Sequence, residues 1–169
     1  MANKNSTLVS NLFAKPQVAN DVQELHGRKR VALGTIALEA ADLSATDTVM
    51  LCPIPSNAVI TSIQIANDDL DTGATNTFDL GVYTANNAGD TFTAVDDDCY
   101  VTASTQLRAA ATFTELRWET LNINTLGQKV WEDAGATEDP GDQYFIGMLF
   151  DAAGDQAGDI SFIIEYVVD

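Results

Sequence analysis

Short apolar runs broken by turn residues are the feature that most constrains the fold of this chain. In the run that ends at Ala66, Val59, Ile63 and Ile65 fall on one face of an extended chain, and polar residues lie between them. Clusters of Gly, Asn, Asp and Pro separate such runs, at the spacing that is typical of a sandwich or a barrel. The predicted strands are Val31–Leu38, Thr48–Cys52, Val59–Ala66, Thr77–Val82, Cys99–Thr102, Thr112–Trp118, Lys129–Glu132, Tyr144–Phe150 and Ile160–Val168.

Three local features refine these strands. Pro53 and Pro55 cannot donate to a ladder, so they confine the end of the second strand to an edge or a turn. Residues 104–111 could form a short helix instead of a strand. The stretch TANNAGDTFTAVDDD, residues 84–98, is predicted to be a long connection.

Eight or nine strands without a long helix predict an all-β fold. A last strand that runs to the C-terminus is held by its neighbours, which favours two packed antiparallel sheets. We therefore predict an antiparallel β-sandwich of jelly-roll type over residues 29–169. An extended N-terminal arm is predicted over residues 1–28, where neither helical nor strand periodicity is sustained.

Charge is divided unevenly along the chain. The sequence has 8 basic and 25 acidic residues, a net charge of −17. Residues 1–30 hold five basic and two acidic residues, a net +3, whereas residues 31–169 hold three basic and 23 acidic residues, a net −20. Because nucleic-acid binding needs a basic face, the acidic body is not expected to bind DNA or RNA.

The N-terminus and the cysteines indicate where the chain is made. The start, MANKNSTLVSNLFAKPQ, is polar and mixed, so no signal peptide is expected, and no apolar run is long enough for a membrane helix. A soluble protein made in a cytoplasm is predicted, without membrane association. Cys52 and Cys99 stand alone in the sequence and are expected to be reduced and half-buried.

Signatures of catalysis are missing from the sequence, so no enzyme is predicted. The only histidine, His26, falls beside the arm, where no packed pocket would orient it against a nucleophile. No glycine-rich phosphate-binding motif occurs. The aromatic residues fall mostly within strand runs, where core packing is expected.

Calcium is the cofactor that the acidic loops bring into question. The loops NDDLDTG and VDDD offer the hard oxygen ligands that calcium prefers, although neither follows the EF-hand pattern. The calcium candidates are Asp68, Asp69 and Asp71. The alternative is that these carboxylates keep a turn solvated, because Asp and Asn bond to their own backbone in turns. We predict no metal and no other cofactor.

The stretch PIPSNAVITSIQIANDDLDTGATNTFDLGVYT, residues 53–84, resembles a segment of small structural proteins of tailed bacteriophages. In those proteins a strand after a Pro-rich turn, an acidic Leu-Asp turn and a strand ending in a Gly-aromatic step recur. The strands YFIGMLFD and ISFIIEYVV agree more loosely. The resemblance implies a capsid decoration (cement) protein, a structural virion protein with a β-sandwich fold that binds and stabilises the outside of the capsid.

The resemblance implies the major capsid protein as partner and the capsid exterior as location. The arm combines apolar and basic residues that could lie across capsid subunits. The predicted capsid-binding residues are Leu8, Leu12, Phe13, Lys15, Arg28, Lys29 and Arg30. Arg28, Lys29 and Arg30 could instead only flank the first strand and guard it against aggregation.

Two further expectations concern assembly and an alternative role. A homo-oligomer, with a trimer favoured, would cover exposed residues such as Ile163 and Val167. The alternative function is a head-fibre module that binds host glycans, for which Tyr83, Phe92 and Tyr100 are the candidate exposed aromatics. A tail or connector component is a further alternative.

Overall fold

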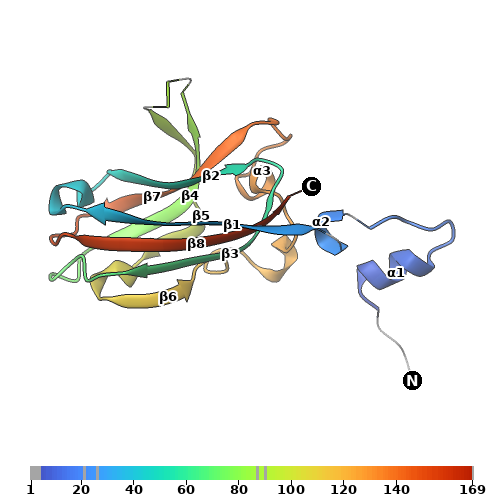
Figure 1. The fold of residues 1–169 in the computed structure, drawn as a ribbon, viewed down its shortest axis with the longest axis horizontal. Coiled ribbons are helices and arrows are strands. Elements are labelled where there is room, and N and C mark those ends of the chain that lie inside the picture. Colours follow the sequence, from blue (N-terminus) through green and yellow to red (C-terminus); the bar gives the residue numbers. More distant parts are fainter. Residues whose placement is uncertain (1–4, 21, 26, 87, 90, 169) are drawn as a thin grey trace.

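In the residues that the computed structural model describes (5–20, 22–25, 27–86, 88–89 and 91–168), eight strands form two antiparallel sheets of four. The sheets face each other, and the N-terminal segment stands beyond one end of them (Figure 1). The helices and strands are α1 Thr7–Phe13, α2 Val22–Leu25, β1 Arg28–Leu38, β2 Thr48–Pro55, β3 Val59–Asn67, β4 Thr77–Ala85, β5 Phe92–Ser104, β6 Ala111–Glu115, α3 Val130–Asp133, β7 Gln143–Ala152 and β8 Gly158–Val168. Short 3-10 turns occur at Ala40–Leu43, Gln106–Arg108 and Ile123–Thr125.

The strand order confirms the predicted sandwich and is that of a jelly roll. One sheet has the order β1-β8-β3-β6 and the other β2-β7-β4-β5. The first strand therefore pairs with the last, the second with the seventh, the third with the sixth and the fourth with the fifth. This is the pairing expected when a long antiparallel hairpin is wound into a jelly roll. Long antiparallel ladders hold β8 between β1 and β3, and β7 between β2 and β4.

The core lies between the two sheets and is built by the alternation read from the sequence. Every second residue of the central strands is fully buried, and the residues between them face outward. These core residues are Phe78, Leu80 and Val82 of β4, Ile146, Met148 and Phe150 of β7, Ile63 and Ile65 of β3, and Ile160 and Ile164 of β8. Val59 departs from the predicted face, because the β3–β8 register shifts between Ile60 and Ser62 and turns Ile60 inward instead.

The prolines lie where their missing donors do least harm. Pro53 and Pro55 belong to β2, an edge strand of its sheet, as the sequence predicted. Cys52 of β2 and Cys99 of β5 are free thiols, and both are buried rather than half-buried. Burial raises the pKa of Cys52 to about 12 and that of Cys99 still further.

Two local predictions were wrong. Residues 129–132 do not form a strand, since Val130–Asp133 is a single helical turn. Its start is held by Glu132, whose carboxylate accepts the Lys129 backbone N–H at 2.8 Å, and by the Val130 N–H, which donates to Ala58 at 2.9 Å. The stretch 84–98 is not all connection either, because β5 begins at Phe92 and runs along β4. The short helix considered within residues 104–111 is the 3-10 turn Gln106–Arg108.

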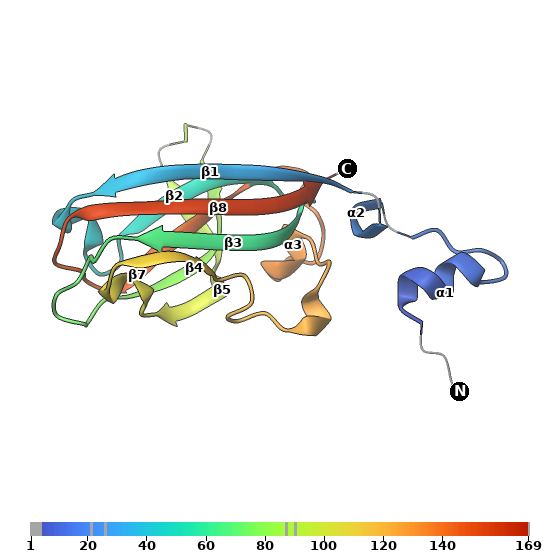
Figure 2. The ribbon, with the colours of Figure 1, turned by 60° about the horizontal axis from the view of Figure 1, so that its bottom comes forward.

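The N-terminal segment leaves the sandwich where β1 begins. Both views show α1 beyond that end of the sheets, and the last residues of β8 lie beside the start of β1, where the segment leaves (Figures 1 and 2). Over the residues that the structure describes, no helix has the length and apolarity that crossing a membrane requires.

Candidate functional site

The N-terminal segment is folded locally and not as a strand of its own sheet. Helix α1 is capped at its start by Ser6, whose hydroxyl accepts the Val9 N–H at 3.4 Å, and is followed by Ala14 in extended backbone. The segment then turns back along the helix. Asn20 holds this turn, because its side chain bonds to that of Asn11 at 2.8 Å and donates to the Leu8 carbonyl at 3.0 Å.

This segment presents large apolar side chains to solvent. Phe13 is 77% exposed, and the others lie on both sides of the turn. They are Val9, Phe13, Val18, Val22 and Leu25. Since a free monomer gains nothing by exposing so many apolar groups in so short a stretch, they mark a surface suited to a partner. We call residues 5–25 the arm. Leu8 is half-buried and Lys15 is exposed, while the side chain of Leu12 and all of His26 lie outside what the structure describes.

A cleft of about 490 Å³ separates the start of α1 from the end of the sandwich. It is bounded on one side by Ser6 to Leu8 and on the other by Val59 to Thr61 of β3 and by Leu126 and Gly127. Leu126 is 71% exposed. The arm is therefore not packed tightly onto its own body at this end.

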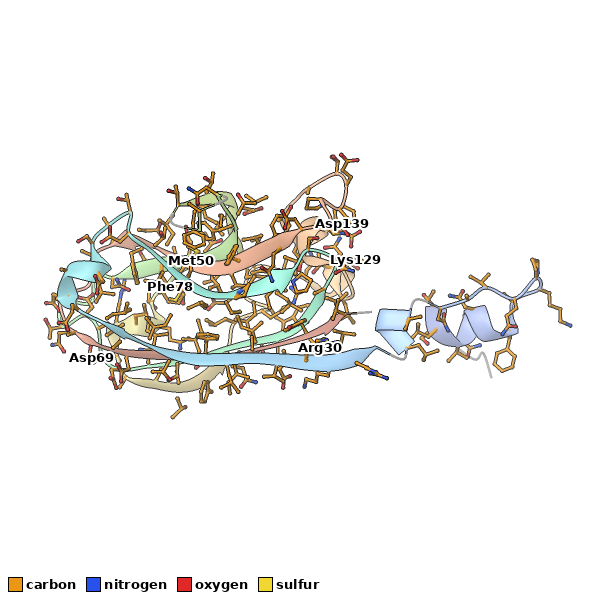
Figure 3. The ribbon with its side chains drawn as sticks, turned by 45° about the horizontal axis from the view of Figure 1, so that its top comes forward. Arg30, Met50, Asp69, Phe78, Lys129 and Asp139 are labelled. Atoms are coloured by element: carbon orange, nitrogen blue, oxygen red, sulfur yellow. The ribbon has the colours of Figure 1, made fainter. Side chains whose placement is uncertain are left out.

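The three basic residues Arg28, Lys29 and Arg30 lie in β1, not in the arm. They pair with Val168, Val167 and Tyr166 of β8, and Lys29 forms an ion pair with Glu165. In the described part of the chain, Arg28 and Arg30 form no ion pair, and Figure 3 shows Arg30 at the end of β1 from which the arm leaves. Residues 1–27 hold two basic and two acidic residues, so the net positive charge of residues 1–30 comes from Arg28, Lys29 and Arg30, at the root of the arm where β1 begins.

Exposed apolar residues continue from this root along the outer face of β1. Val31 is 51% exposed and Leu33 71%. Leu33 lies opposite Ile163 of β8, which is half-buried, as is Val167. Sequence reasoning missed Val31 and Leu33, because β1 is apolar on both faces and its alternation does not identify the outer one. Their position on an edge strand is a property of the topology.

The proposed calcium candidates lie at the opposite end of the sandwich, as the position of Asp69 in Figure 3 shows. Asp71 is buried, and its carboxylate accepts the backbone N–H groups of Gly73, Thr75 and Asn76. These bonds, that of Asn76 foremost, lower the pKa of Asp71. Asp69 accepts the Asp71 N–H at 3.2 Å, and Asp68 accepts the Asp159 N–H at 3.0 Å. The carboxylates of Asp69 and Asp71 thus bond to the loop's own backbone and that of Asp68 to β8. Calcium binding there stays the untested alternative.

The aromatic residues considered for glycan binding are not exposed. Tyr83 is 2% exposed and Tyr100 is fully buried. Phe92 is half-buried and packs edge-on against Phe145, with ring centroids 5.2 Å apart. An exposed aromatic platform at these three residues was therefore a wrong prediction.

A buried ion pair accounts for the most unusual polar residues of the core. Arg117 and Asp133 have fully buried side chains, with Arg117 Nη2 3.1 Å from Asp133 Oδ2. The Tyr100 hydroxyl also donates to Asp133 at 3.1 Å, and Arg117 Nε donates to the Ile60 carbonyl at 2.7 Å. Burial raises the pKa of Asp133 to about 6, while Arg117 and Tyr100 oppose that rise. Through Ile60 of β3 and Tyr100 of β5, this cluster joins the two sheets. Its charged side chains are fully buried and out of reach of a substrate, so we assign it a structural role.

The fold and the arm define an eight-stranded jelly roll with an apolar N-terminal extension, and comparison with known proteins identifies where the same fold occurs. No family model matches the sequence, and no curated protein matches it. A chain in the capsid of Ralstonia phage GP4 has a similar structure, with a TM-score of 0.60 and 22% identity, over 89% of this chain and 91% of that one. A chain of the capsid asymmetric unit of cyanophage Pam1 has a TM-score of 0.56 and 19% identity, over the whole of both chains. At these identities the shared property is the fold.

Proposed function

We propose that this chain is a structural protein of a tailed-bacteriophage virion that binds the outside of the capsid and stabilises it, as a decoration or cement protein. The observation that carries the proposal is the exposure of the apolar side chains of the arm. The arm itself lies beyond the end of the jelly roll (Figure 2). The proposed partner is the major capsid protein, and the role is structural, not enzymatic.

The arm supplies the apolar part of the proposed contact. Fully burying a side chain the size of Phe or Val contributes roughly 1.5–3 kcal/mol. Phe13, at 77% exposed, has most of that gain available on docking. Several such contacts per copy, repeated over a symmetric shell, give a firmly held layer even when each contact is weak.

The root of the arm supplies the polar part. Arg28 and Arg30 are exposed at the start of β1 and form a small positive patch. The rest of the jelly roll is strongly acidic. A carboxylate on the capsid surface could pair with either of them, which would fix the orientation of the jelly roll on the shell. The remaining acidic surface would face solvent, where it disfavours self-association and repels nucleic acid.

The similarity of the fold to that of known phage capsid chains also supports this role. The two similar structures are chains of phage capsids, and in one of them the match extends over both chains completely. A virion location on the capsid exterior, after synthesis in the host cytoplasm, follows from the proposal. A trimer would cover Leu33, Ile163 and Val167 on the outer face of β1 and β8.

The test uses capsids of the phage that encodes this chain, stripped of the protein. Full-length protein should co-sediment with them, whereas a chain lacking residues 2–27 should remain folded and stay in the supernatant. The double variant Phe13→Ser with Val18→Ser should lose most of the binding in an otherwise intact chain. Circular dichroism verifies the fold of each variant.

Phe113→Ser is the matched control. Phe113 is an exposed aromatic, 48% accessible, on the opposite edge strand β6. It should bind like the unmodified protein. Unchanged binding by the arm-deleted chain, or equal losses in the Phe13 and Phe113 variants, would refute docking through the arm.

A further inference from the structure

A bulge in β5 gathers three carboxylates over the outer face of its sheet. In the β4–β5 ladder, Leu80 pairs with Val101 and Val82 with Asp96, so Gly81 alone lies opposite the four residues 97–100. The bulge folds directly over Gly81. A Cβ at that position would lie 2.1 Å from the Asp96 carbonyl oxygen, so only glycine allows this approach.

The carboxylates of this bulge are within reach of a single ion. One oxygen each from Asp96, Asp97 and Asp98 lies within 4.8 Å of the others. Calcium binds oxygens at 2.3–2.6 Å, so two of its ligands can be up to about 5 Å apart. Unlike Asp71, whose oxygens are occupied by backbone N–H groups, Asp97 and Asp98 accept no hydrogen bond from a backbone donor among the described residues.

Two more carboxylates lie beside the bulge. Asp79 and Asp151 stand on the same outer face of β4 and β7 and contact each other. Burial, and then the charges of Asp151 and Asp98, raise the pKa of Asp79, although the Ala103 N–H bonds to it at 2.7 Å. The two ion pairs in the described part of the chain, Lys29–Glu165 and Arg117–Asp133, involve none of these groups. The negative charge here therefore forms no ion pair with a basic side chain of the described residues.

The Tyr83 hydroxyl is a second and independent sign of a missing partner. Tyr83 is 2% exposed, and its hydroxyl has no hydrogen-bond partner among the described residues. Its ring lies over Gly147, where a Cβ would be 3.0 Å from the ring edge. Gly147 pairs with Gly81, over which the bulge folds, so the Tyr83 ring lies beside the bulge. Burial first, and then the charges of Asp97 and Asp79, raise the pKa of Tyr83. Buried hydroxyls normally have a partner.

We infer that the β5 bulge is a divalent-cation site of calcium type, with Asp96, Asp97 and Asp98 as ligands, Asp79 and Asp151 beside them, and the Tyr83 hydroxyl bonded to the ion or to its water. The candidate ligand atoms are carboxylate oxygens, which calcium prefers. The ion would tie the edge strand β5 to β4 and β7. This inference goes beyond the proposed function and does not depend on it.

The test is a titration of chelator-treated full-length protein with CaCl₂, followed by calorimetry and thermal unfolding in 0.15 M NaCl. We expect one saturable site and a melting temperature that rises with calcium. Asp97→Asn should weaken calcium binding at least tenfold. Without calcium, this variant should melt no lower than the unmodified protein, because it relieves repulsion, and this result separates lost binding from misfolding.

Glu138→Gln is the charge-matched control, since Glu138 is exposed and lies in a distant loop. It should leave calcium affinity unchanged. Terbium gives a second readout, because an excited tyrosine near the ion sensitises its luminescence, and Tyr83→Phe should reduce that emission. The inference fails if no saturable binding occurs, or if Glu138→Gln loses as much affinity as Asp97→Asn.

Discussion

Replacing Asp133 with alanine would leave the Arg117 guanidinium charged inside the sandwich without its counter-ion. The guanidinium cannot respond by losing its proton, because arginine side chains are not deprotonated in proteins. Its remaining contacts would be the Ile60 carbonyl and the rings of Trp118 and Tyr100, whose centroids lie 4.8 and 5.3 Å from the guanidinium carbon. The Tyr100 hydroxyl would lose its acceptor as well.

The expected cost of Asp133→Ala is about 3–5 kcal/mol of the free energy of unfolding, as for other buried pairs broken at one partner. The reciprocal change, Arg117→Met, should cost less. Asp133 can take up a proton in the folded chain, since its pKa is already raised to about 6 with Arg117 present. The loss is then mainly one hydrogen bond to Ile60 and the ring contacts, about 2 kcal/mol in all.

Urea unfolding at pH 7, followed by circular dichroism, measures both variants. The reasoning requires that Asp133→Ala be the more destabilised of the two. It requires also that Arg117→Met recover part of its loss at pH 5.5, where Asp133 is more readily protonated. If Arg117→Met is the more destabilised variant at both pH values, an unpaired buried guanidinium is not the main cause of the loss in stability, and the reasoning is refuted.

Four other results are expected. Stability should rise as the pH falls from 7 to about 5, because the folded chain protonates Asp133 near pH 6 and the unfolded chain only near 3.8, and urea midpoints of Asp133→Asn should show a smaller rise. Below pH 3.8 stability should fall, since the pKa of Asp71 is lowered by folding and its protonation breaks the loop bonds. The thiols of Cys52 and Cys99 should react with a thiol reagent only after unfolding, because both are buried and their pKa values are raised. Gly81→Ala should destabilise the protein by about 1–3 kcal/mol in thermal unfolding, and more than Gly147→Ala, because a new Cβ meets backbone at the first site and mainly the flexible end of Met50 at the second.

The sheets were predictable because the core strands alternate strongly. β4 and β8 place apolar residues at every second position, and that period alone assigns their inner faces. The sequence of Val130–Asp133 shows why shorter elements were not. Four residues complete only one helical turn, so no period separates such a turn from a short strand.

β5 was missed in part for a different reason. Its first half is an edge strand rich in Thr and Asp, which composition alone associates with a loop. Its bulge depends on Gly81 in the neighbouring strand, a contact between residues that no local pattern connects. The burial of Tyr83 likewise depends on a contact between strands, because its ring lies over Gly147 of β7.

The candidate arm was only partly accessible to sequence reasoning. Leu8 and Phe13 stood out as apolar residues in a polar terminus, whereas Val31 and Leu33 did not stand out in an apolar strand. Whether a strand residue faces the core or a partner depends on which sheet edge it occupies, and pairing between the two chain ends sets that edge. Docking through these residues stays a prediction.

Four acidic residues, Asp71, Asp139, Asp79 and Asp96, respond to folding in two opposite ways, which leads to one more prediction. Asp71 and Asp139 accept hydrogen bonds that lower their pKa values, so their charge stabilises the fold. Asp79 and Asp96 are partly buried beside other carboxylates, which raises their pKa values, so their charge opposes the fold at neutral pH. Protons and calcium would relieve the same repulsion, and their effects should therefore not add. The rise in melting temperature at saturating calcium should be smaller near pH 4.5 than at pH 7, and an equal or larger rise at pH 4.5 would show that calcium acts elsewhere.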